Sequence, residues 1–74
     1  MDRRNVEMNL EQAKRHVAIG KGDIERQRNV VAELQRDGHD TKLAQELLLS
    51  FERLQAMHVA DVERLTAELA ALPE

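Results

Sequence analysis

The segment Asp37-Gly38-His39-Asp40-Thr41 interrupts a chain whose flanking stretches are long and periodic. Gly38 suits the left-handed conformation just beyond a helix C-terminus, where a residue with a Cβ atom would be strained. Asp40 and Thr41 are residue types whose side chains accept hydrogen bonds from the first free amides of a following helix. The segment therefore predicts a short turn, at about residues 38–40, between two antiparallel helices.

Upstream of this turn, residues recur at alternating spacings of four and three, the heptad pattern of a helix that packs along one seam. Gly20 and Gln27 are the only members that are not apolar, and a buried amide in a helix bundle commonly fixes the register. We therefore predict a first helix over about residues 9–37, with residues 1–8 either a flexible segment or an extension of that helix. The seam positions are Val6, Leu10, Ala13, Val17, Gly20, Ile24, Gln27, Val31 and Leu34.

The downstream half has a similar pattern, with one additional four-residue step near His58. Pro73 ends it, because proline cannot continue a helix. The pattern predicts a second helix over about residues 41–72, and folding the chain at the turn places Gly20 opposite His58. The seam positions are Leu47, Phe51, Leu54, His58, Val62, Leu65, Leu69 and Leu72.

The segment Gly20-Lys21-Gly22-Asp23 is the main argument against an unbroken first helix. Two glycines inside a helix cost about 2 kcal/mol relative to alanine, and Asp23 is a residue type that caps a new helix. The heptad nevertheless stays in phase from Val17 to Ile24, whereas a turn would usually shift it. We predict an unbroken helix, with a three-helix arrangement as the alternative.

The composition excludes several classes of protein. The 74 residues include one Phe, no Trp, no Tyr and no Cys, and the net charge is −3. Without cysteine the chain has no disulfide, no thiol nucleophile and no cysteine-based metal site. No apolar run is long enough for a membrane span, and Met1–Leu10 lacks the apolar stretch of a secretory signal. We therefore expect a cytoplasmic location.

The predicted fold is all-α, an antiparallel two-helix hairpin that dimerises into a four-helix bundle. A second partner is expected because a domain of about 70 residues seldom obtains more than about 3–5 kcal/mol from its own core. The expected function is a non-catalytic protein-protein interaction or regulatory module, which binds a second copy or an amphipathic helix of another protein. The predicted interface residues are Leu43, Leu47, Leu48, Phe51, Leu54, Val59 and Val62.

A metal-binding bundle is one alternative function. His58 and Asp61 are one helical turn apart, and the hairpin brings His16 near Asp61, so the three side chains form a weak candidate for a divalent metal site. Packing and surface roles explain the same histidines without a metal. We accordingly predict no metal and no cofactor, with this cluster as the candidate if there is one.

Nucleic-acid binding is a second alternative. The basic residues of the first half, Arg26 and Arg28 among them, would gather on one face of a symmetric dimer, as in an RNA-binding hairpin dimer resembling the plasmid copy-number regulator Rop. Interleaved acidic residues and the lack of stacking aromatic rings argue against nucleic acid as a partner. No nucleophile, base and orienting residue occur at a suitable spacing, so we predict no catalytic residue and no enzyme activity.

Residues on both sides of the turn carry a family resemblance. They are Ile24, Gln27, Leu34, the turn segment 37–41, Ala44, Leu47-Leu48, Phe51 and His58. In these residues the chain resembles short bacterial proteins that are described only as hypothetical. The resemblance covers roughly residues 13–65 and implies a bacterial helical hairpin. No activity is assigned to that family, so the resemblance implies no functional residue.

Overall fold

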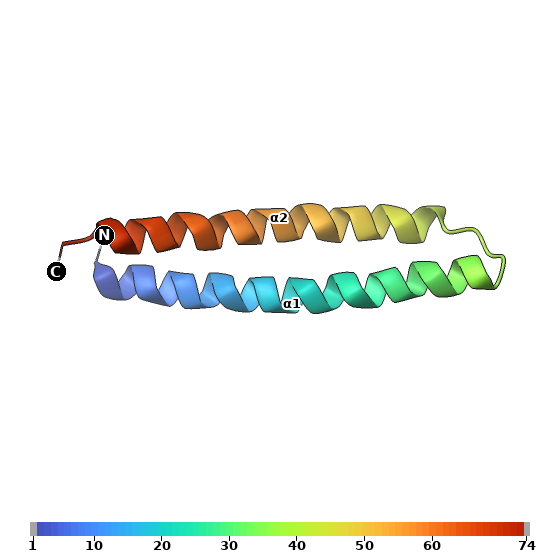
Figure 1. The fold of residues 1–74 in the computed structure, drawn as a ribbon, viewed down its shortest axis with the longest axis horizontal. Helices are drawn as coiled ribbons and strands as arrows, with labels where there is room; N and C mark the ends of the chain where they lie inside the picture. The colour runs from blue at the N-terminus through green and yellow to red at the C-terminus, as the bar shows by residue number, and fades with distance from the viewer. Residues whose placement is uncertain (1, 74) are drawn as a thin grey trace.

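The computed structural model describes residues 2–73, which form two antiparallel helices lying side by side (Figure 1). Helix α1 comprises Arg3–Arg36 and helix α2 comprises Lys42–Ala71. The molecule measures 59 × 14 × 13 Å, and the start of α1 and the end of α2 lie at the same end of the hairpin. The predicted all-α hairpin is thus confirmed. Neither of the two described helices is long and apolar enough to cross a membrane.

Helix α1 begins six residues earlier than the predicted residue 9. Asp2 is its N-cap residue, and Asp2 Oδ1 accepts a hydrogen bond from the backbone N–H of Arg4 at 3.4 Å. Val6 is only 1% exposed and anchors the first turns against α2. Residues 3–8 are therefore a helical extension and not a flexible segment. Met1 and Glu74 lie outside the described residues.

Helix α1 is unbroken through Gly20-Lys21-Gly22-Asp23, so the three-helix alternative is wrong. Gly20 lies on the seam directly against Gln55, where a Cβ atom would overlap the Gln55 carboxamide. Because Gly20 has no side chain, it leaves a space that Gln55 of α2 fills. The helix tolerates this glycine because tertiary packing offsets its low helix propensity.

The end of α1 is a Schellman motif. The backbone N–H of His39 donates to Leu34 O at 2.9 Å, and that of Gly38 donates to Gln35 O at 3.1 Å. Gly38 has a φ of +76°, the left-handed conformation that this motif requires. The predicted role of Gly38 as the residue that ends the first helix agrees with this geometry.

The two predicted capping residues of α2 behave differently. Asp40 Oδ1 accepts a hydrogen bond from the backbone N–H of Lys42 at 3.0 Å, as predicted. Thr41 is the N-cap residue by position, but its side chain makes no hydrogen bond to the helix backbone. Thr41 Oγ1 instead accepts one from Gln45 Nε2 at 2.8 Å. Of the two residues, Asp40 therefore supplies the cap, and Thr41 has a ψ of 2°, which departs from the extended conformation typical of a capping residue.

The seam of α1 is the predicted one, since all nine positions are buried or half-buried. The seam of α2 differs from the prediction, because it is a regular heptad without the additional step near His58. Leu47 and Leu54 consequently lie outside it, and Gly20 faces Gln55 and not His58. The seam residues of α2 are Ala44, Leu48, Phe51, Gln55, His58, Val62, Leu65, Leu69 and Leu72.

The sequence predicts that Gly20 lies opposite His58, whereas in the structure it faces Gln55. The alignment of the two helices is therefore shifted by three residues, close to one helical turn. In Figure 1, α1 extends past the start of α2, and the linker runs back beside it. Two hydrogen bonds across the seam match this register: Gln27 Nε2 donates to Ala44 O at 2.9 Å, and Gln55 Nε2 donates to Val17 O at 2.8 Å. Each glutamine thus satisfies its amide on the backbone of the opposite helix.

The two glycines of α1 give a matched test of this packing. Replacing Gly22 with alanine should raise the free energy of unfolding by about 1 kcal/mol through helix propensity, because the new Cβ atom meets only the flexible end of Arg26. The same change at Gly20 displaces the Gln55 amide from Val17 O, and a hydrogen bond of this kind contributes about 0.5–1.5 kcal/mol. We expect Gly20→Ala to be less stable than Gly22→Ala by about 1–2 kcal/mol in urea unfolding followed by circular dichroism. Equal stabilisation by the two substitutions would contradict the Gly20–Gln55 contact.

Candidate functional site

The hairpin buries few side chains of its own. Six of its described residues are buried, and nine large hydrophobic side chains remain exposed. One apolar cluster, Val6, Leu10, Ala13 and Leu65, forms near the chain ends. The two helices alone thus leave more large hydrophobic side chains exposed than they bury. The buried residues are Val6, Leu10, Ala13, Ile24, Gln27 and Leu65.

Six of the exposed hydrophobic side chains gather on one side of the hairpin, which we term the apolar face. Ile19 and Leu54 line the same cleft between the helices. Val30 is eleven residues from Ile19, close to three helical turns. Leu43, Leu47 and Met57 lie eleven, seven and three residues from Leu54, which are also close to whole helical turns. Leu43 is the most exposed of them at 79%. The apolar face comprises Ile19, Val30, Leu43, Leu47, Leu54 and Met57.

The predicted interface residues are divided between three environments. Three of them, Leu43, Leu47 and Leu54, lie on the apolar face. Three others are half-buried on the seam against α1, namely Leu48, Phe51 and Val62. Val59 lies across the seam, in a shallow hollow with Lys14 and Val17. The seven residues therefore do not share one surface of the hairpin, because the phase of the α2 seam differs from the one inferred from the sequence.

The side of the hairpin opposite the apolar face carries the one ion pair found between the two described helices. Arg28 Nη2 lies 3.5 Å from Glu52 Oε2, and both side chains are largely exposed. Such exposed pairs contribute little stability, typically about 0–1 kcal/mol. Leu49 also lies on this side, in a shallow hollow with Glu52 and Val31. This side is therefore mixed in polarity.

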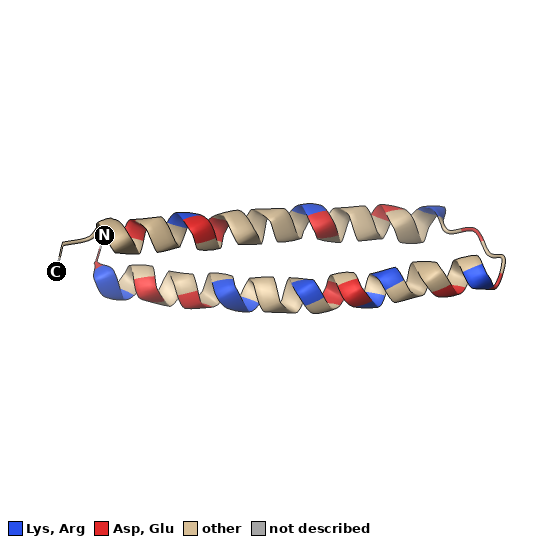
Figure 2. Cartoon of the chain, viewed as in Figure 1, with Lys and Arg blue, Asp and Glu red and all other residues tan. Residues whose placement is uncertain are grey.

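Acidic and basic residues are interspersed along both helices, so the structure shows no extended basic stripe in the view of Figure 2. The two arginines considered for nucleic-acid binding are each paired, Arg26 with Asp23 and Arg28 with Glu52. Nucleic-acid binding relies on basic side chains that are free to neutralise phosphates. The charge distribution therefore gives no specific support to that alternative.

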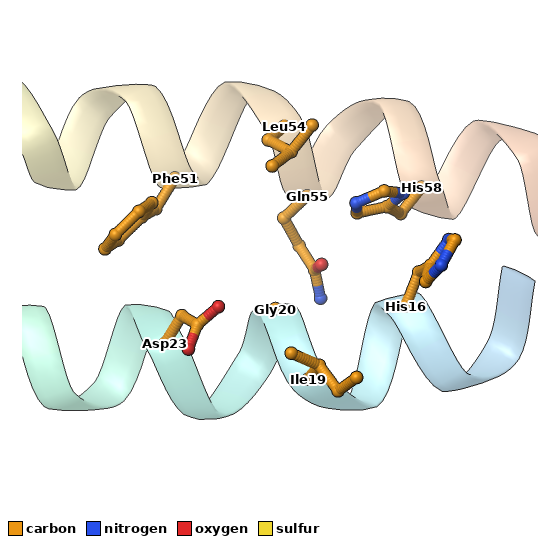
Figure 3. Close-up of a pocket in the computed structure, with 8 residues that line it drawn as sticks. All are labelled: His16, Ile19, Gly20, Asp23, Phe51, Leu54, Gln55 and His58. Atoms are coloured by element: carbon orange, nitrogen blue, oxygen red, sulfur yellow. The ribbon is translucent and has the colours of Figure 1, made fainter.

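A cleft of about 140 Å³ opens on the apolar face near the middle of the hairpin. The rings of His16 from α1 and His58 from α2 lie beside one another at its edge, with centroids 5.0 Å apart and planes tilted by 47° (Figure 3). Gln55 Oε1 is buried and has no hydrogen-bond partner among the described residues. The lining residues are His16, Ile19, Gly20, Asp23, Phe51, Leu54, Gln55 and His58.

Of the three metal candidates, the two histidines lie ring beside ring, and Asp61 does not line their cleft. Asp61 lines a separate hollow with His16 and is paired with Arg64 at 3.5 Å. Within residues 2–73 there is no group of three or more His, Cys, Asp or Glu residues that could hold a metal ion. The sequence missed Gln55, the polar residue that accompanies the two histidines in the cleft. Its signal was available, because Gln55 and His58 are three residues apart on one helix.

Comparison of the chain with protein-family models, with curated proteins and with solved structures finds no match. The resemblance to short bacterial helical-hairpin proteins therefore stays a prediction. Two features of the hairpin itself bear on its function, the apolar face and the histidine cleft.

The register that creates the cleft can be tested by nuclear Overhauser effects in solution. We expect effects between the ring protons of His16 and His58, whose centroids are 5.0 Å apart. We also expect effects between the side-chain amide of Gln55 and the Hα atoms of Gly20, because the carboxamide fills the space beside this glycine. Effects between the His58 ring and Gly20 would instead indicate the register expected from a symmetric fold about the turn.

Proposed function

We propose that this protein is a small non-catalytic interaction module, and that its apolar face packs against the apolar face of a second copy to form a four-helix bundle. The observation that carries the proposal is the exposure of Leu43, Leu47 and Leu54 along one side of α2. Contiguous exposed apolar side chains of this kind are typical of an interaction site.

The size of the hairpin supports a partner. A core of six buried residues is small for a chain of 74 residues, and self-association is a common way for such chains to gain stability. One long side of the molecule measures 59 × 14 Å, which is close to the roughly 800 Å² per partner of a standard protein interface. A second hairpin that covered the whole of this side would therefore make a contact of standard size.

The charges on this side are compatible with a second copy as the partner. A two-fold symmetric interface places the same surface on both partners, so an unpaired charge near its centre would meet its own copy. Two acidic groups on this side are paired within the hairpin, Asp23 with Arg26 and Asp61 with Arg64. Pairing of these charges leaves the leucine side chains of α2 as the dominant feature of the surface.

A pair of leucine substitutions tests the interface. Leu54 on the apolar face and Leu49 on the other side of α2 are 48% and 47% exposed, so they form a matched pair. Five residues correspond to about 140° around a helix, so a glutamate at position 49 would point away from the proposed interface. We expect Leu54→Glu to weaken dimerisation at least tenfold, because it buries a charge without a partner, and Leu49→Glu to leave the dimer intact.

The measurement is solution mass by light scattering coupled to size exclusion, with circular dichroism as the check on helix content. The expected mass of the wild type is near twice 8.5 kDa, and that of Leu54→Glu approaches 8.5 kDa at the same concentration. A wild-type mass near 8.5 kDa would contradict the second copy as partner and leave the face for a different protein. Equal effects of the two substitutions would contradict the assignment of the interface to the apolar face.

Leu48→Glu serves as the contrasting variant. Leu48 is half-buried on the seam between the helices, so a glutamate there would destabilise the packing of the two helices against each other. We expect Leu48→Glu to lose helix content, whereas Leu54→Glu keeps the hairpin contacts. A Leu48→Glu variant that keeps full helix content and still dimerises would contradict the seam assignment of α2.

A further inference from the structure

The apolar side chains on the outer side of α2 are arranged almost symmetrically about Ser50. Leu43 lies seven residues before Ser50, and Met57 lies seven residues after it. Leu47 and Leu54 lie three residues before and four residues after the same position. These spacings are close to whole helical turns, so the exposed Ser50 lies on the same side of α2 as the four apolar residues. A second α2 that ran antiparallel and crossed at Ser50 would therefore bring apolar side chains opposite apolar side chains.

The same side of α1 is symmetric about a point of its own. Ile19 and Val30 are its two apolar members, and Asp23 and Arg26 lie between them at equal distances from their midpoint. An antiparallel second copy centred on this midpoint places Ile19 opposite Val30. It also places Asp23 opposite Arg26, so each carboxylate meets a guanidinium of the second copy as well as the one in its own helix.

The two centres of symmetry lie at the same level of the hairpin. Gln55 is in contact with Gly20, and Ser50 lies five residues from Gln55 toward the turn. The midpoint of Ile19 and Val30 lies between four and five residues from Gly20 in the same direction. One two-fold axis perpendicular to the helices therefore suits α1 and α2 together. We propose that the second copy packs antiparallel to the first about this axis, an arrangement that rests on the dimer proposed above.

Charged side chains beside the apolar stripe of α2 fit the same arrangement. Glu46 and Arg53 are exposed, and neither forms an ion pair with another described residue. Because Glu46 precedes Ser50 by four residues and Arg53 follows it by three, an antiparallel copy places each glutamate beside an arginine. A parallel copy would instead place each residue beside its own counterpart, so that Asp23 meets Asp23. Like charges brought together oppose association, so the charges favour the antiparallel arrangement.

The arrangement also accounts for two features of the apolar face. Ser50 lies at the axis, where a small side chain lets two helices approach closely, and its Oγ donates to Glu46 O at 3.2 Å, so its hydroxyl group is already paired. The cleft of about 140 Å³ is lined on its α2 side by Leu54, so Leu47 of the second copy lies over it. The cleft is thus the place where each copy receives a side chain of the other.

Disulfide cross-linking tests the arrangement, because the described chain contains no cysteine. Ser50→Cys places one thiol of each copy at the axis, and a disulfide requires Cα atoms about 4.4–6.8 Å apart. Leu43→Cys is the control, since its two thiols would lie on opposite sides of the axis, about 21 Å apart along the helices. In a glutathione redox buffer we expect Ser50→Cys to form a covalent dimer, and Leu43→Cys alone to form roughly tenfold less. A mixture of Leu43→Cys and Met57→Cys should form the mixed dimer, which mass spectrometry identifies.

Light scattering of the reduced variants reports the oligomeric state independently of cross-linking. A dimer in which Leu43→Cys alone cross-links as readily as Ser50→Cys would overturn the antiparallel arrangement while leaving the proposed dimer in place. A reduced Ser50→Cys variant that is dimeric and yet does not cross-link would do the same. A mass near 8.5 kDa for the wild type would instead contradict the dimer itself.

Charge reversal provides a second test. Glu46→Arg should weaken dimerisation severalfold, because it sets two guanidinium groups beside each other, and Arg53→Glu should do so through two carboxylates. The double variant should regain the affinity of the wild type. Positions 46 and 53 are about 10 Å apart within one helix, so such recovery requires contact between copies. Unchanged affinity of both single variants, or a double variant that stays weak while circular dichroism shows intact helices, would overturn the placement of Glu46 beside Arg53.

Discussion

The register of the two helices depends on two glutamine side chains that cross the seam. Gln27 Nε2 donates to Ala44 O on α2, and Gln55 Nε2 donates to Val17 O on α1. Sliding one helix along the other would break both bonds and leave partly buried amides unpaired, at a cost of about 1–3 kcal/mol for each group. Gly20 makes the second bond possible, because the absence of its side chain leaves room for the Gln55 carboxamide. Polar pairing therefore selects one alignment among several that apolar packing alone would allow.

Both features with functional implications follow from this alignment. Because Gln55 occupies the seam, Leu54 lies outside it and joins Leu47 on the apolar face. The same alignment sets His58 beside His16 and opens the cleft between them. A hairpin with α2 displaced along α1 by one turn would separate the two histidines. The surface available for recognition is thus a consequence of the polar pairs between the helices.

Much of the fold follows from local signals. The heptad of α1, the left-handed conformation at Gly38 and the cap at Asp40 depend on residues close together in the chain, and the structure agrees with each. The early start of α1 was missed, although Asp2 is a favoured capping residue. The phase of α2 was missed because leucines occur both on its seam and beside it, at Leu47 and Leu48 for example. Hydrophobicity alone does not distinguish these two stripes, so the predicted interface mixed seam and surface residues.

The sequence by itself determined two long helices, the place of the turn and the seam of α1, because helix propensity, capping and heptad spacing act over a few residues. The tertiary structure decided which stripe of α2 faces α1, which leucines are left on the surface and which two histidines meet. The physical reason is the distance in sequence between the groups that fix the alignment: Gln55 and Val17 are 38 positions apart, and Gln27 and Ala44 are 17 apart. Their hydrogen bonds exist only after the chain has folded back on itself, and no local pattern encodes which carbonyl each amide will reach.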